Sequence, residues 1–263
     1  QVALLIITSI VEGTQEYISE RINDLIQFIL QVSDFDDPYV FSSFCNTLSE
    51  LIEYVPVPIS LYIEEISSFV LPNIVKYTND SIMLLEKLFS KCERAPKDTG
   101  NVFNELSSLI NQASVHFDQI DMIISCILSL LLQSDSPEEY VSSFLPILNR
   151  IYQTRPDMKD IVFDFYGSVV SIAPNVVKND LPDLSKMILQ SLESSEQPLD
   201  EADLQFFSPA ALCLKQIARI LPASLISMSV VQQATPYLLK MIGVDEADQF
   251  SIKSLDSSDD TAF

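Results

Sequence analysis

Apolar residues recur at helical spacing along most of this chain. Between residues 59 and 77 they form one stripe, with steps of 3, 4, 4 and 3 residues, made of Ile63, Ile66, Val70, Ile74 and Tyr77. Glu64, Glu65 and Ser68 fall on another face of the same segment. This pattern predicts an amphipathic α-helix that buries its stripe against neighbouring helices.

The same pattern divides the chain into about six antiparallel helix pairs. The expected pairs are 1–13 with 18–32, 38–55 with 59–77, 80–94 with 101–115, 118–133 with 137–153, 158–173 with 177–193, and 203–221 with 226–243. Turns such as Asp36-Asp37-Pro38 and Lys97-Asp98-Thr99-Gly100 separate them and supply helix N-caps. The sequence therefore predicts an all-α fold.

A proline-centred phrase recurs inside the apolar segments. Leucine or threonine, proline, any three residues and a basic residue occur around Pro72, Pro146, Pro182 and Pro236, at steps of 74, 36 and 54 residues. A period of about 40 residues is typical of helical repeat arrays, so we expect a right-handed superhelix of stacked pairs. Pro72 would kink its helix or mark a late start near Ser67, and its recurrence predicts a shared bend.

The charge and glycine content limit the folds and binding partners that are compatible with this chain. The chain has 37 acidic and 15 basic residues, a net charge of −22, and only four glycines in 263 residues. Few glycines argue against a β-rich or dinucleotide-binding fold. Such acidity repels nucleic acid and anionic membranes and attracts basic proteins, although it is also explained by solubility alone.

Catalytic and metal-binding patterns are missing from the sequence. His116 is the single histidine, and Cys45, Cys92, Cys126 and Cys213 are too dispersed for a zinc site. No nucleophile elbow or phosphate-binding loop is present. We therefore expect no catalytic residue, metal or cofactor, and no membrane insertion, because the longest nearly apolar run, 122–132, is too short.

Two further features have competing interpretations. The cluster Lys87, Lys91, Arg94 and Lys97 either complements a helix C-terminus or docks an acidic partner. Acidic stretches at 194–203 and 243–263 interrupt the series of helix pairs. We expect residues 1–243 to be the repeat array, an internal part of a longer one, and 244–263 to be a mobile acidic insert or linker.

Three stretches carry a resemblance to a known family. They are Val2 to Gly13, which leads through a helix to the Asp37-Pro38 turn; 169–242, with an acidic break at 193–203 and Pro236 in its closing helix; and Asp248 to Lys253. The order of these stretches and their spacing along the chain are similar to those of the importin-β (karyopherin-β) superfamily. Within it, the chain most resembles the branch that imports ribosomal proteins and histones. Tyr39-Val40-Phe41 departs from the family's usual Val-Arg after the turn.

The resemblance implies an armadillo-type solenoid of HEAT repeats and a nuclear import receptor that shuttles between cytoplasm and nucleus. Its family binds basic cargo on the inner helices and FG-repeat nucleoporins between outer helices, and Ran-GTP releases the cargo. The acids that we then expect on the concave face are Glu64, Glu65, Glu105, Glu138, Glu139, Asp180, Asp183 and Glu193. The alternative is a static HEAT scaffold of the phosphatase or vesicle-coat type.

Overall fold

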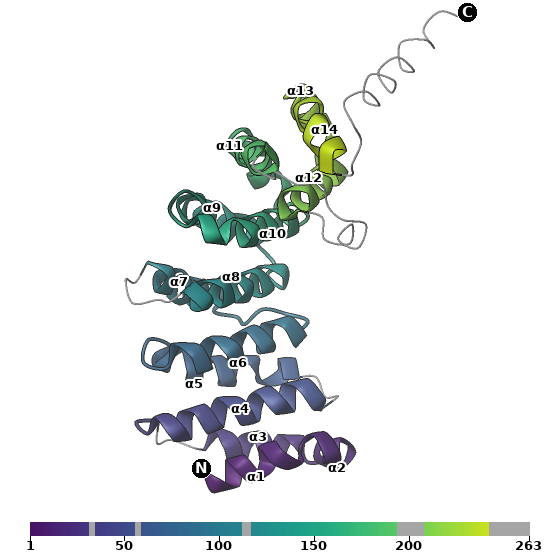
Figure 1. The fold of residues 1–263 in the computed structure, drawn as a ribbon. Helices are drawn as coiled ribbons and strands as arrows, with labels where there is room; N and C mark the ends of the chain where they lie inside the picture. Colours follow the sequence, from purple (N-terminus) through teal and green to yellow (C-terminus); the bar gives the residue numbers. More distant parts are fainter. Residues whose placement is uncertain (32–34, 56–58, 112–116, 194–207, 242–263) are drawn as a thin grey trace, which may run out of the picture. The chain divides into compact units, whose positions relative to one another are not determined.

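The structure is a computed structural model that describes residues 1–31, 35–55, 59–111, 117–193 and 208–241. These residues form fourteen α-helices and four short 3-10 helices, with no strand among them (Figure 1). The all-α prediction is therefore confirmed. His116 and the acidic stretches at 194–203 and 244–263 lie outside the described residues.

The helices follow one another in the predicted order. Their bounds are α1 (Val2–Ile10), α2 (Gln15–Ser19), α3 (Ile22–Leu30), α4 (Pro38–Tyr54), α5 (Ile63–Val70), α6 (Thr78–Lys91), α7 (Thr99–Ile110), α8 (Phe117–Leu132), α9 (Pro137–Thr154), α10 (Lys159–Val169), α11 (Pro174–Glu193), α12 (Pro209–Ile220), α13 (Pro222–Ser227) and α14 (Val230–Met241). The 3-10 helices are Glu12–Thr14, Ile59–Tyr62, Leu71–Asn73 and Pro156–Met158.

Several predicted helices are shorter or divided. Segment 18–32 is divided between α2 and α3, which are separated at Glu20 and Arg21. Segment 226–243 is divided between α13 and α14, where Ser229 has a φ of 54° and so cannot continue a right-handed helix. Helix α5 keeps only the middle of segment 59–77, because 3-10 turns stand at both of its ends.

The recurring proline does not occupy one structural position. At Pro72 the α-helix has already ended at Val70 and the chain continues as a 3-10 turn. Pro146, Pro182 and Pro236 instead lie inside α9, α11 and α14. The four prolines therefore do not share one position relative to their helices. The late helix start considered near Ser67 is wrong, because α5 begins at Ile63.

Predicted caps begin two of the helices. The Asp37 carboxylate accepts a hydrogen bond of 2.8 Å from the backbone N–H of Tyr39, and Pro38 occupies the first turn of α4. The Asp98 carboxylate accepts from the backbone N–H of Asn101 at the start of α7. These side chains satisfy N–H groups that have no partner within the helix.

The chain forms two compact units, residues 1–144 and 145–263. In the first unit the leading helix of each pair stacks on the next, in the order α1, α4, α6 and α8 (Figure 1). In the second unit α10 packs on α12, and α11 packs on α12 and α14. Each unit therefore builds its core between successive helix pairs.

Several side-chain hydrogen bonds of the first unit join residues that are 38 to 40 positions apart in the sequence. Thr8 and Thr47 are 39 residues apart and 2.9 Å from each other, and Ser42 donates to Asp80, 38 residues away. The partners in Lys76–Asp36 and Gln119–Asn79 are each separated by 40 residues, and those in Tyr62–Asn23 by 39. These five contacts thus link successive parts of the first unit at a separation of about 40 residues.

An aromatic cluster fills the space between α4 and its neighbours. Phe41 and Phe44 on α4 are completely buried, and both contact the ring of Phe35 edge-on, at centroid distances of 5.4 and 5.0 Å. Phe41 also stacks on Tyr77 at 4.7 Å, and Phe44 lies 6.4 Å from Phe69. These five rings thus pack together around α4.

Candidate functional site

The carboxylates proposed to bind cargo begin with two residues in the first turn of α5. Glu64 accepts hydrogen bonds of 3.0 and 3.1 Å, one on each oxygen, from the backbone N–H of Lys97. It therefore fixes the segment before α7 against α5. Glu65 is exposed, and both charges lie where a helix N-terminus favours an anion.

The other three acids of the first unit lie on α7 and α9. Glu105 is half-buried on α7, and Glu138 and Glu139 are exposed in the first turn of α9. Among the described residues, no cation forms an ion pair with any of the three. These carboxylates are thus accessible to a basic partner.

In the second unit, Asp180 belongs to a hydrogen-bonded group between helices. The hydroxyl of the fully buried Tyr166 donates to the Asp180 carboxylate and lies 2.8 Å from Asn149 Oδ1. The Asn149 amide lies 3.5 Å from both Asp180 oxygens. Burial raises the pKa of Tyr166, and the hydrogen bond to Asp180 adds to this effect. Asp180 therefore holds α9, α10 and α11 together.

The two remaining acids are on α11. Asp183 is exposed and forms an ion pair of 2.9 Å with Lys186, one helical turn away. Glu193 is exposed at the last residue of the helix. Of the eight predicted acids, Glu64 and Asp180 thus serve internal contacts and Asp183 has a local cation.

Two residues of the basic cluster, Lys87 and Lys91, lie on α6, and Arg94 and Lys97 follow the end of this helix. Lys87 and Lys91 form ion pairs of 3.6 and 3.4 Å with Glu53 on α4. Glu53 therefore compensates both charges, and Lys91 also lies in the last turn of α6, as the interpretation of a complemented helix C-terminus expected. The backbone of Lys97 is bound by Glu64, as described above.

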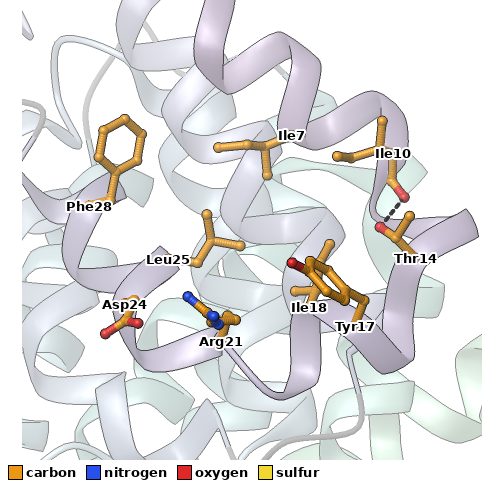
Figure 2. Close-up of a pocket in the computed structure, with 9 residues that line it drawn as sticks. All are labelled: Ile7, Ile10, Thr14, Tyr17, Ile18, Arg21, Asp24, Leu25 and Phe28. Carbon is orange, nitrogen blue, oxygen red and sulfur yellow. Dashed lines mark hydrogen bonds between the residues drawn. The ribbon is translucent and has the colours of Figure 1, made fainter.

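A groove in the first helix pair was not foreseen from the sequence. It has a volume of about 550 Å³ and is lined by Ile7, Ile10, Thr14, Tyr17, Ile18, Arg21, Asp24, Leu25 and Phe28 (Figure 2). Figure 2 shows apolar side chains from α1 and α3 on its two sides, with Asp24 on α3 and Arg21 just before the start of that helix. The available signal was the composition of α1, which is apolar on every face.

Metal-binding groups and membrane-spanning helices are absent from the described residues. No group of three or more potential metal-binding side chains occurs among them. A search of the same residues finds no helix with the length and apolarity needed to cross a membrane. All four cysteines are buried and unpaired.

Burial keeps the cysteine thiols protonated. Desolvation raises the pKa of Cys92 to about 11 and that of Cys213 to about 12, and the charge of Asp164 adds to the effect at Cys213. Burial also raises the pKa of Cys45 and Cys126. Low thiolate content makes these residues poor nucleophiles.

The raised pKa values predict alkaline destabilisation. An unfolded thiol ionises near pH 9, so the unfolded state gains stability as pH rises above that value while the folded thiol stays protonated. In Cys213→Ala this contribution is absent. Between pH 7.5 and 10, urea unfolding should show a loss of stability about 1 kcal/mol smaller in the variant than in the unchanged protein. Equal losses would contradict the assignment.

Comparison with known proteins found no matching family model, no matching curated protein and no matching solved structure.

Proposed function

We propose that this chain is a HEAT-repeat segment of a nuclear import receptor of the importin-β type, which binds basic cargo such as ribosomal proteins or histones. The observation that carries the proposal is the stacking of helix pairs whose connecting hydrogen bonds recur about 40 residues apart. This spacing is the one expected of HEAT repeats. A right-handed superhelix, partner FG-repeat nucleoporins and Ran, and shuttling between cytoplasm and nucleus belong to the same proposal.

Charge supports a basic cargo. The net charge of −22 steers cationic partners towards the chain, and Glu65, Glu105, Glu138 and Glu139 offer carboxylates on the second helices of three successive pairs. Exposed ion pairs contribute only about 0–1 kcal/mol each, so binding depends on several carboxylates acting together. Binding should therefore weaken as salt shortens the screening length below about 8 Å.

A charge reversal tests this surface. The triple variant Glu65→Lys, Glu138→Lys and Glu139→Lys leaves the structural residues Glu64 and Asp180 unchanged. We expect about tenfold weaker binding of a fluorescent histone-tail peptide, measured by anisotropy, since three weak pairs together contribute about 1–2 kcal/mol. Helicity should be retained, with a small decrease in melting temperature from the lost helix-end charges.

The matched control reverses three exposed acids away from the second helices, Glu12, Glu93 and Asp160, and so changes the net charge equally. This control variant should weaken binding of the histone-tail peptide by much less than the first triple variant does. An equal loss in both triples would show that only total charge matters. In the whole receptor, Ran loaded with GTP should release the cargo and Ran loaded with GDP should not; release by neither form would favour a static scaffold.

A further inference from the structure

A second groove lies on the leading helices of three successive pairs. It has a volume of about 380 Å³ and is lined by Asn46, Ser49, Glu50, Met83, Glu86, Lys87, Asp121, Met122 and Ser125. All nine residues belong to α4, α6 and α8, and none to α5 or α7. The groove is therefore separate from the carboxylates on the second helices.

The lining combines soft apolar surface with unpaired negative charge. Met83 is 54% exposed, although methionine normally contributes to cores, and Met122 is half-buried beside it in the groove. Methionine is flexible and polarisable, and it adapts to varied apolar partners. An exposed methionine in a hollow thus offers a contact for one apolar side chain.

The charges decide what accompanies that side chain. Glu50, Glu86 and Asp121 have no ion-pair partner among the described side chains, and the groove's lysine, Lys87, is already bound to Glu53. A purely apolar occupant would remove water from these carboxylates without replacing it, which is costly. An acidic or phosphorylated occupant would be repelled. A cationic occupant replaces the displaced water with ion pairs and is the one attracted by the charge of the groove.

We infer that this groove binds a basic segment of a partner protein, with lysine or arginine side chains on Glu50, Glu86 and Asp121 and an intervening aliphatic side chain against Met83 and Met122. The recognition is that of an amphipathic basic peptide in a methionine-containing groove. The inference does not depend on the proposed import function, because it concerns other helices and holds for any basic partner.

The test uses three labelled 16-residue peptides and the whole chain. The first alternates lysine pairs with leucine, the second replaces each leucine by serine, and the third replaces each lysine by glutamate. The groove variant is Glu50→Gln, Glu86→Gln and Asp121→Asn, which preserves side-chain shape and removes charge. The control variant is Glu12→Gln, Glu93→Gln and Asp160→Asn, three exposed acids that belong neither to the groove nor to the carboxylates on the second helices.

We expect the lysine–leucine peptide to bind the groove variant about tenfold more weakly than the unchanged chain, and the control variant with less than a twofold change. Met83 is exposed, and its replacement Met83→Gln should weaken binding of the lysine–leucine peptide about threefold. Binding of the lysine–serine peptide should not change. The glutamate peptide should not bind. Circular dichroism checks that each variant is folded.

Two results would overturn the inference. If the groove and control variants weaken the peptide equally, the acidic surface attracts cations without a defined site. If Met83→Gln affects both lysine peptides equally or neither, the methionines do not contribute an apolar contact. Loss of histone-tail binding in the second-helix Lys variant, with groove binding retained, would leave both proposals standing separately.

Discussion

Replacing Phe44 by alanine is expected to destabilise the unit formed by residues 1–144 by about 3–5 kcal/mol. Its ring is completely buried and lies 5.0 Å from Phe35, 6.2 Å from Phe41 and 6.4 Å from Phe69. Truncation removes the buried apolar surface and leaves a cavity that the surrounding rings, held by their own packing, fill only in part. Urea unfolding followed by circular dichroism measures the loss.

Tyr39→Ala is the matched control for this substitution. Tyr39 lies on the same helix, α4, but 71% of its side chain is exposed. Its replacement should change stability by less than about 0.5 kcal/mol, as is usual for a surface position. Similar effects of the two substitutions would mean that the aromatic cluster does not form in solution.

Removing the Tyr166 hydroxyl is expected to cause the second large loss of stability. Tyr166→Phe keeps the ring in its buried site but deletes the donor to Asp180 and the contact with Asn149. A hydrogen bond to a charged group contributes about 1.5–3 kcal/mol, and we expect a loss of that size. Because the pKa of Tyr166 is raised, the neutral donor persists at and above pH 10, so the loss should be constant between pH 6 and 9.

Tyr237→Phe provides the control within the same unit. Tyr237 is half-buried on α14, and no hydrogen bond of its hydroxyl occurs within the described part of the chain. Its replacement should be nearly neutral in urea unfolding. If Tyr166→Phe is equally neutral, Asp180 does not bind the phenol, and this aspartate returns to the set of carboxylates accessible to cargo.

Local sequence pattern predicted the buried stripes well. Ile63, Ile66, Val70 and Ile74 are all at most 1% exposed, as their spacing indicated, and only Tyr77 at the end of the stripe is half-buried. Helix interruptions were harder to foresee. The breaks at Arg21 and Ser229 carry no glycine or proline at the break itself, so packing against other helices decides them rather than local propensity.

The roles of individual acids depend on partners that are distant in sequence. Glu64 binds a backbone group 33 residues away, and Asp180 binds side chains 14 and 31 residues away. A helical pattern places both on a polar face but does not show that a partner already occupies them. The groove on α4, α6 and α8 was missed for the same reason, since its residues come from three separate segments.

Contacts between residues 38 to 40 positions apart affect how the first unit folds. Because each helix pair contacts chiefly the pairs next to it, every step of assembly closes a loop of similar and modest length, and low contact order favours rapid folding. Order can spread from any pair to its neighbours. Native-state hydrogen exchange should therefore show opening in blocks of one helix pair, with a lesion such as Phe44→Ala lowering protection in its own block and the adjacent ones first.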